Sequence, residues 1–153
     1  MPGGFVGVER PYADWCVHAF SAGRRPWVLV ANTASLFSVV MTGRGIDGDG
    51  ELTRSVLTAL RDYLHGSDRA FFFDRFVEPE AASAAFAPIG RAALQDAMKE
   101  LASHARWFMT RSDLSAFETA DRVNRTPLAF LRGRTPGEVF PELVGSNGFV
   151  PGG

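Results

Sequence analysis

The amino-acid sequence predicts an α+β fold, in which a small N-terminal antiparallel sheet, made of a hairpin plus a third strand, packs against about four to five helices. Two observations lead to this prediction. Up to residue 41 the chain contains short runs rich in aromatic and β-branched residues, and from about Leu52 the apolar residues recur at helical spacing. Strands followed by helices are typical of α+β domains.

The predicted sheet begins with a hairpin. Residues 14–20, DWCVHAF, and 27–31, WVLVA, are strand-like runs separated by SAGRRP. Within that turn, Gly23 suits a position that needs positive φ. A third apolar run, at residues 35–41, is the next expected strand.

The first helix is expected from about residue 52 to Gly66, where glycine favours a helix end. Asp49 or Thr53 can cap its start. Residues 69–77, RAFFFDRFV, fit either a buried strand or the entry to a helix, because periodicity cannot separate the two. The following run, EPEAASAAFAP, is interpreted as a short helix or an ordered loop.

Three further helices are predicted in the second half of the chain. Residues 89–109 carry a regular apolar stripe. Another helix is expected after Asp113 or Ser115, because Ser115 and Glu118 have the spacing of a capping box. The last begins in TPGEVFPEL, where Thr135 can cap the helix, Pro136 suits the first turn, and Glu138 lies three residues after the cap, as in a capping box.

The length of 153 residues and the hydrophobic content of 46% predict one domain, which we place at residues 12–144. The glycine- and proline-rich ends, 1–11 and 145–153, are expected to be flexible tails. A net charge of -1 gives no general attraction to nucleic acid or to an anionic membrane. The chain shows no signal-peptide pattern and no long apolar run, so we expect a cytoplasmic protein with no membrane partner.

The run GIDGDGELT resembles the middle of an EF-hand calcium loop. We place Asp47, Asp49 and Gly50 at the third, fifth and sixth loop positions. Gly45 then stands where the first ligand should be, and Val56 stands where the bidentate glutamate that closes the site should be, so both of these ligands are missing. The favoured interpretation is therefore a solvated turn before a helix. The three histidines lack metal-ligand spacing and there is one cysteine, so neither a metal nor a cofactor is predicted.

A possible catalytic pair lies in the first strand. Side chains alternate along a strand, so Asp14, Cys16 and His18 would share one face. Such a set could form a thiol nucleophile, with either His18 or His104 as its base. Residues two apart on a strand run parallel rather than converge, so a packed cysteine is the favoured interpretation.

The C-terminal third is locally basic. Arginines at helix ends commonly solvate the surface, and the alternative is a face that binds an anionic ligand, a nucleic acid strand or an acidic protein. Nucleic acid is not favoured, because aromatic residues do not interleave with the arginines. The arginines concerned are Arg106, Arg111, Arg122, Arg125, Arg132 and Arg134.

Two segments resemble a family of short bacterial proteins classed as a domain of unknown function. That family opens with a tryptophan-led strand, a basic turn, a "vL.vN" strand and a "tL" segment. It closes with an asparagine and a proline before a basic turn, a second proline and a terminal helix. Here the opening features fall on Trp15, Arg24, Arg25, Leu29, Asn32 and Leu36, and the closing features on Asn124, Pro127, Arg134 and Pro136.

The resemblance spans about Asp14 to Leu143 and implies a compact α+β fold and a bacterial cytosolic origin, without a known reaction. The chain departs from the family in its centre. Where the family resembles NRSVLGSMND, this chain has GRAALQDAMKEL and keeps only Arg91 and Leu94 of that pattern. If the lost polar residues form a site in the family, this protein lacks that site or uses another.

These observations predict a binding or interaction module that recognises a partner protein or an anionic ligand. The alternative is a small hydrolase or transferase that uses Cys16 with a histidine, and whether the protein is an enzyme stays open. A homodimer joined through the edge of the sheet is a third hypothesis, beside a monomer. The predicted ligand-binding residues are Arg24, Arg25, Asn32, Arg91, Asn124 and Arg125.

Overall fold

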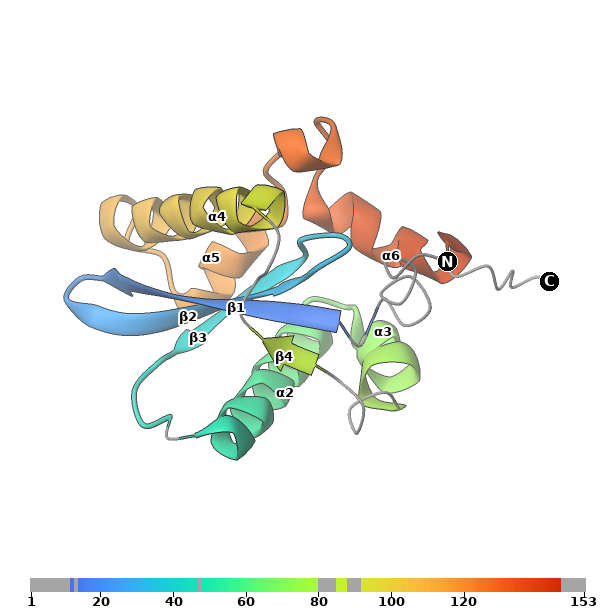
Figure 1. Cartoon of the computed structure of the whole chain (residues 1–153), viewed down its shortest axis with the longest axis horizontal. Helices are drawn as coiled ribbons and strands as arrows, with labels where there is room; N and C mark the ends of the chain where they lie inside the picture. Colours follow the sequence, from blue (N-terminus) through green and yellow to red (C-terminus); the bar gives the residue numbers. More distant parts are fainter. Residues whose placement is uncertain (1–11, 13, 47, 80–84, 88–91, 147–153) are drawn as a thin grey trace.

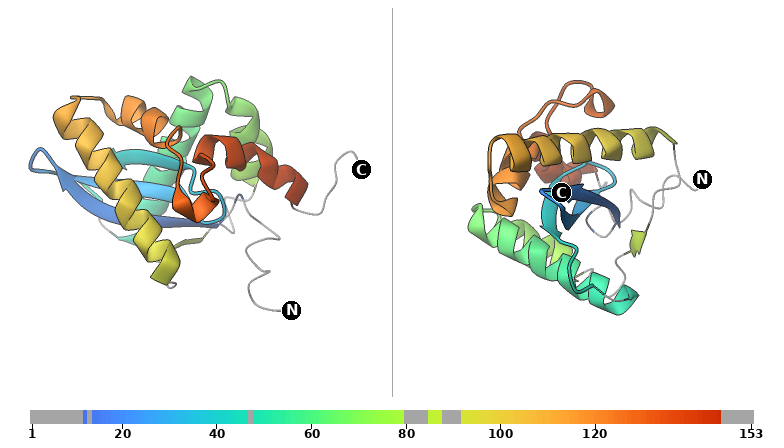
Figure 2. Two further views of the ribbon diagram at one scale, coloured as in Figure 1. Left: turned by 90° about the horizontal axis from the view of Figure 1, so that it is seen from above. Right: turned by 90° about the vertical axis from the view of Figure 1, so that its left-hand side faces the viewer.

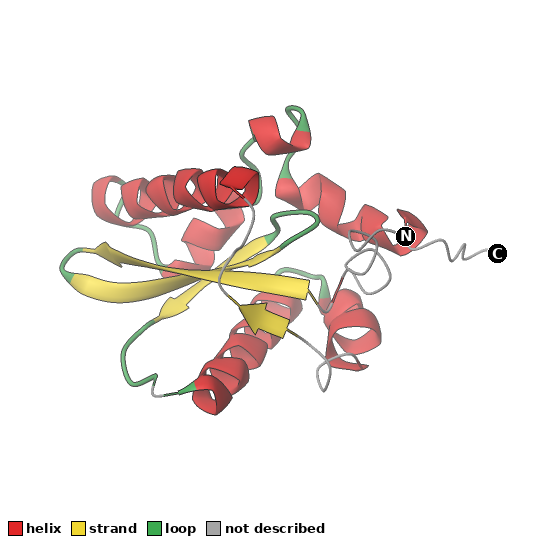
Figure 3. Cartoon of the chain, in the orientation of Figure 1, coloured by secondary structure: helices red, strands yellow, loops and turns green. Residues whose placement is uncertain are grey.

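A four-stranded sheet of order β3-β2-β1-β4 lies at the centre of the protein (Figures 1 and 3). The computed structural model describes residues 12, 14–46, 48–79, 85–87 and 92–146. Strands β1 (Asp14–Ala22) and β2 (Arg25–Asn32) form the predicted hairpin, and β3 (Ser38–Thr42) pairs antiparallel with β2. The predicted fold class is confirmed: an N-terminal three-strand antiparallel sheet packs against five helices of the described chain.

The hairpin turn explains the register of β1 and β2. Gly23 has a φ of 61°, as predicted, and Arg24 follows with a φ of 65°. Two consecutive residues of positive φ are typical of a type I′ turn, whose twist matches that of the flanking strands. The pairing then runs without interruption from Ala22 opposite Arg25 to Trp15 opposite Asn32.

The fourth strand, β4 (Ala85–Ala87), pairs parallel with β1 and was not predicted. It lies in the run that we interpreted as a short helix or an ordered loop, and for these three residues that interpretation was wrong. Asp14 of β1 lies opposite Ala85, and Cys16 lies opposite Ala87. A strand of three residues is too short to show alternation, and its backbone pairing leaves no signal in the sequence.

Four helices correspond to predicted ones, and both predicted capping boxes are present. In the first box the N–H of Glu118 donates to Ser115 Oγ at 3.1 Å, and in the second the N–H of Glu138 donates to Thr135 Oγ1 at 3.2 Å. The four helices are α2 (Asp49–Gly66), α4 (Ala92–Arg111), α5 (Ala116–Val123) and α6 (Pro136–Ser146), with a 3-10 turn η5 (Ala129–Leu131) between the last two.

The segment that was left open between strand and helix is helical. It forms α3 (Ala70–Phe72) and the π-helical turn η3 (Phe73–Val77). Phe73 and Val77 are buried, whereas Phe71 is 59% exposed. At the C-terminus, α6 continues to Ser146, so residues 145 and 146 belong to a helix rather than to the predicted tail. The predicted tail residues 1–11 and 147–153 lie outside the described residues.

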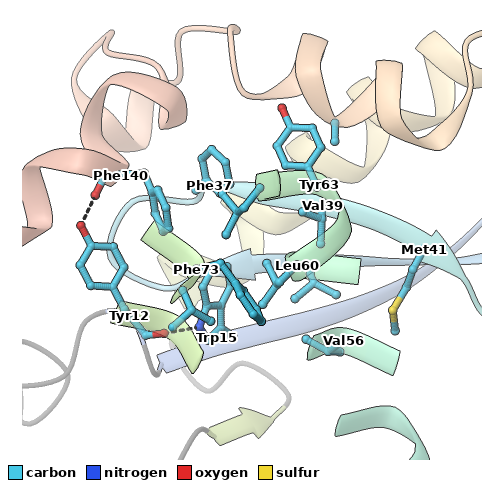
Figure 4. Close-up of a cluster of buried hydrophobic side chains, with 14 of the residues drawn as sticks. Tyr12, Trp15, Phe37, Val39, Met41, Val56, Leu60, Tyr63, Phe73 and Phe140 are labelled. Atoms are coloured by element: carbon cyan, nitrogen blue, oxygen red, sulfur yellow. Dashed lines mark hydrogen bonds between the residues drawn. The ribbon is translucent and has the colours of Figure 1, made fainter. Parts of the chain in front are cut away.

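Helices cover both faces of the sheet, with α4 and α5 on one side and α2 and α3 on the other (Figures 1 and 2). Strand alternation divides the core accordingly: Trp15 and Val39 pack on the α2 side, whereas Cys16 and Val40 pack on the α4 side. Figure 4 shows the first of these clusters, where Tyr12 donates a hydrogen bond to the carbonyl of Phe140 at 2.7 Å. None of the described helices is long and apolar enough to cross a bilayer.

One buried hydroxyl on α5 leads to a prediction about stability. Thr119 is 0% exposed, and its Oγ1 has no hydrogen-bond partner among the described residues. Replacing it by valine removes a desolvated polar group while keeping the side-chain shape. We expect Thr119→Val to raise the free energy of unfolding by about 1 kcal/mol, measured by urea denaturation.

Thr126→Val is the matched control, because the Thr126 hydroxyl donates to the carbonyl of Arg122 at 2.9 Å. That substitution removes a satisfied hydroxyl and should not stabilise the protein. A loss of stability in Thr119→Val as large as that in Thr126→Val would mean that the Thr119 hydroxyl makes a favourable interaction.

Candidate functional site

The thiol of Cys16 lies in the core between the sheet and α4. Only 2% of Cys16 is exposed, and its thiol donates a hydrogen bond to the carbonyl of Ala31 at 3.4 Å. Burial, with a smaller contribution from the negative charge of Asp14, raises the pKa of Cys16 from 9.0 to about 12. A thiol of this pKa is protonated at neutral pH, which argues against Cys16 as a nucleophile.

The histidines that were considered with Cys16 do not complete a catalytic pair. His18 extends from the same face of β1, but no hydrogen bond among the described residues joins it to the thiol. His104 lies on α4 and contacts Glu100 at 3.6 Å. Within the described residues, no three His, Cys, Asp or Glu side chains come together as a possible metal site.

Asn32, a predicted ligand-binding residue, is fully buried and organises the loop between β2 and β3. Its Oδ1 accepts hydrogen bonds from the N–H groups of Ala34 and Ser35 at 3.1 and 3.0 Å, and from the Ser35 hydroxyl at 3.0 Å. Its amide nitrogen lies 3.4 Å from the carbonyl of Asp14. The Asn32 side chain therefore serves the backbone around it.

The predicted arginine ligands are not gathered into one site. Arg24 and Arg25 are exposed at the hairpin tip, at the opposite end of β2 from Asn32. Arg125 follows α5 and pairs with Asp121 at 2.8 Å. Arg91 lies outside the described residues.

Other arginines of the C-terminal third also have partners. The guanidinium of Arg134 binds the carboxylate of Glu142 through two hydrogen bonds, one of them 2.7 Å long, and this contact lowers the pKa of Glu142. Arg106 donates from Nε to the carbonyl of Ser21 at 2.9 Å. These contacts offset or occupy several of the cations on which the predicted arginine-rich face depends.

Asn124, the last of the predicted ligand residues, closes one end of the sheet edge. Its Oδ1 accepts a hydrogen bond from the N–H of Ser38 at 2.8 Å, and its Nδ2 donates to the Ser38 carbonyl at 2.9 Å. This is the pair of bonds that a residue on a neighbouring strand would make. The Asn124 side chain thus takes the place of one residue of an added strand.

Beyond Ser38, no strand among the described residues pairs with the outer edge of β3. Hydrogen bonds at the two ends of the β2–β3 pairing join the N–H of Asn32 to the Phe37 carbonyl and the N–H of Gly43 to the Pro26 carbonyl. Bonding alternates along an antiparallel pair, so Val39 and Met41 bond to β2. The N–H and C=O groups of Val40 and Thr42, like those of Ser38, therefore point away from the sheet.

A groove, which we call the β3 groove, follows this edge. A hollow of about 230 Å³ lies between β3, α2 and α5, and a second of about 590 Å³ lies between the end of β3, the next loop and α2. Ala59 and Asp62 line both hollows and join them. The other lining residues are Val39, Val40, Tyr63, Ala116, Phe117 and Ala120 in the first hollow, and Met41, Thr42, Arg44, Gly45, Ile46, Glu51, Arg54, Ser55 and Thr58 in the second.

A network between α2 and α5 closes the groove at the Ser38 end. The hydroxyl of Tyr63 donates to Asp121 Oδ1 at 3.1 Å and lies 3.4 Å from Nδ2 of Asn124. Burial is the main cause that raises the pKa of Tyr63, so its phenol stays protonated and able to donate. The ring of Phe117 lies 4.9 Å from that of Tyr63 and so close to Gly66 that a Cβ there would be 2.9 Å from it.

Within the described residues, the fold and the groove define a small α+β domain in which Asn124 pairs with the first residue of β3 and a groove follows the rest of that strand's edge. Residues 6–139 match the family described as Domain of unknown function (DUF6933), and the chain belongs to this family, which confirms the resemblance seen in the sequence. No curated protein matches the chain. A solved structure of the catalytic core domain of BIV integrase is similar at a TM-score of 0.49 and 12% identity, covering 86% of this chain and 95% of that chain.

The environment of Cys16 predicts a slow reaction with thiol reagents. A rise in pKa from 9.0 to about 12 leaves very little thiolate at neutral pH. We expect the folded protein to react at least roughly a thousandfold more slowly than the urea-unfolded chain, as followed with a chromogenic disulfide reagent. The control is Ser21→Cys in a Cys16→Ala background, which places a thiol at an exposed position of β1. Fast labelling of native Cys16 would revive the nucleophile hypothesis.

The contacts of Asn124 predict a large effect on stability. Asn124→Ala removes two hydrogen bonds and leaves the N–H and C=O of Ser38 without partners at a position that is 0% exposed. We expect a loss of about 3 kcal/mol in the free energy of unfolding. Arg125→Ala is the control, because its surface ion pair should contribute little. Equal urea midpoints for the two variants would contradict this assignment.

Proposed function

We propose that this protein is an interaction module that binds an extended segment of a partner protein by adding it as a strand at the β3 edge. One observation carries the proposal: the outward N–H and C=O groups of Val40 and Thr42 lie beside a groove, and no strand of the described chain pairs with them. Strand addition takes its affinity from such main-chain groups and its specificity from pockets for alternate side chains.

The contacts of Asn124 support this proposal. An edge strand is usually blunted by a charge, a proline, a bulge or a covering element. Here the Asn124 amide satisfies Ser38 alone, and beyond it the lining changes to the small side chains Ala59, Ala116 and Ala120. Small residues on both flanking helices leave room next to Val40 that larger side chains would fill.

The arrangement of the helices favours a single chain over a second sheet. The first hollow is lined by Ala59, Asp62 and Tyr63 of α2 and by Ala116, Phe117 and Ala120 of α5. An extended peptide can enter between these walls, whereas a strand that carries its own covering helices would collide with them. A homodimer through the sheet edge therefore remains a less favoured hypothesis.

The charges of the groove favour a peptide over a simple anionic ligand. Arg44 and Arg54 line its wider end, but Glu51 lies with them and Asp62 lines both hollows. An anion would meet carboxylates as well as guanidinium groups. A main chain, which is neutral and carries alternating donors and acceptors, suits the exposed edge better.

A proline substitution in β3 tests the proposal. Thr42→Pro removes the outward N–H of an exposed residue without removing a bond to β2. Binders would first be selected from a phage-displayed random heptapeptide library and then titrated as labelled synthetic peptides. We expect roughly tenfold weaker binding to Thr42→Pro.

Thr42→Val is the matched control. It keeps the N–H and removes only the hydroxyl, which accepts a hydrogen bond from the N–H of Arg44 at 3.1 Å. Peptide binding should be unchanged in this variant. Bound peptide should also slow amide exchange at Val40 and Thr42, which is expected to be faster than at Val39 and Met41 in the free protein. Equal binding to the proline and valine variants, or a library without binders, would refute strand addition at β3.

A further inference from the structure

The alternation of side chains fixes which wall of the β3 groove each residue of an added strand would face. Val40 packs on the α4 and α5 side of the sheet, whereas Val39 and Met41 pack on the α2 side. A residue placed opposite a strand residue points to the same face as its partner. The residue opposite Val40 would therefore face α5, and those opposite Val39, Met41 and Gly43 would face α2.

The α5 wall of the groove is apolar. It consists of Ala116, Phe117 and Ala120, and the ring of Phe117 is 43% exposed. A side chain that enters here from the position opposite Val40 would exchange water for contact with these apolar side chains. An apolar residue at this position of the partner would be favoured by burial of its surface.

The α2 wall carries opposite charges at its two ends. Asp62, whose side chain is 69% exposed, lies at the end near Tyr63, and its ion pair with Arg61 is long, at 3.7 Å. Arg54 lies two turns earlier on α2 and faces the wider hollow, where Arg44 and Glu51 also lie. No ion pair among the described residues involves Arg54 or Arg44.

The spacing of these two charges matches an extended chain. Eight residues of helix separate Arg54 from Asp62, which corresponds to about 12 Å along the helix axis. Four residues of an extended strand span about 13 Å and return to the same face. Two side chains four positions apart on a bound segment would thus face Asp62 and Arg54 together.

We infer that the β3 groove selects an extended peptide by its charges, an inference that rests on strand addition as the function. The peptide would carry a basic residue facing Asp62 and an acidic residue four positions away facing Arg54. An apolar residue beside the basic one would face Phe117. For a segment parallel to β3 the order is basic, apolar, any, any, acidic. An antiparallel segment carries the same residues in reverse order.

Four synthetic peptides of equal composition test this selection. TKVTTET and TETTVKT carry the favoured pattern in the two chain directions, and TEVTTKT and TKTTVET are their charge-swapped partners. Each would be labelled with fluorescein and titrated with the full-length protein by fluorescence polarisation. We expect the better-binding peptide of the favoured pair to exceed its swapped partner by about tenfold at low salt, and the ratio to shrink at high salt.

Charge reversal in the protein supplies the matched control. The double variant Asp62→Lys with Arg54→Glu should invert the preference, so that the swapped peptides bind better. Arg111→Glu, at an exposed position of α4 that lines neither hollow, should leave the preference unchanged.

The outcomes separate this inference from the proposed function. Equal binding of favoured and swapped peptides, combined with weaker binding of both to Thr42→Pro, would overturn the charge selection and leave strand addition in place. Failure of all four peptides, together with a random library that yields no binder sensitive to Thr42→Pro, would overturn both.

Discussion

The two hydrogen bonds between Asn124 and Ser38 determine how the helices meet the sheet edge. They fix the end of α5 against the first residue of β3, across 86 positions of sequence, at a site closed to water. The same amide nitrogen lies within hydrogen-bond distance of the Tyr63 hydroxyl, which brings α2 into the contact. Because an unsatisfied buried backbone group is costly, this contact strongly favours one placement of both helices.

That placement also explains why the groove exists. Where Asn124 and Tyr63 meet, the two helices are held together over the edge, and the contact of Phe117 with Tyr63 and Gly66 strengthens the closure. Next to this contact, the first hollow is lined by Ala59 of α2 and by Ala116 and Ala120 of α5, whose side chains are too short to fill it. The groove is therefore closed where large side chains of α2 and α5 meet, and it is open where their side chains are short.

Much of the fold could be predicted because its signals are local. The hairpin turn at Gly23 and the capping boxes at Ser115 and Thr135 depend on residues a few positions apart, and all three are present. Strand β4 left no such signal, since its three residues join the sheet through their backbones. The sequence did not reveal the groove either, because α5, which lines it together with β3 and α2, is far from both of them in the sequence.

In the candidate site, too, local features could be predicted from the sequence and tertiary contacts could not. Family resemblance drew attention to Asn32 and Asn124 without revealing what their amides contact, and both prove to bind backbone groups of the protein itself. Strand alternation placed Cys16 and His18 on one face of β1, but the depth of the core, which the sequence does not report, raises the pKa of the thiol. Residue type and spacing identified the special positions, and only the tertiary contacts defined their roles.

An open sheet edge is a hazard as well as a binding surface, because any extended chain can pair with it. The walls of the β3 groove restrict which chains can do so. A second folded sheet brings its own covering layers and would meet α2 and α5 before its edge reached Val40. An extended segment with only hydrophobic side chains would cross both hollows without offering an opposite charge to Asp62 or to Arg54. If the groove binds a partner peptide as we propose, the same walls would also limit unspecific pairing, and the edge would need no proline or bulge to protect it.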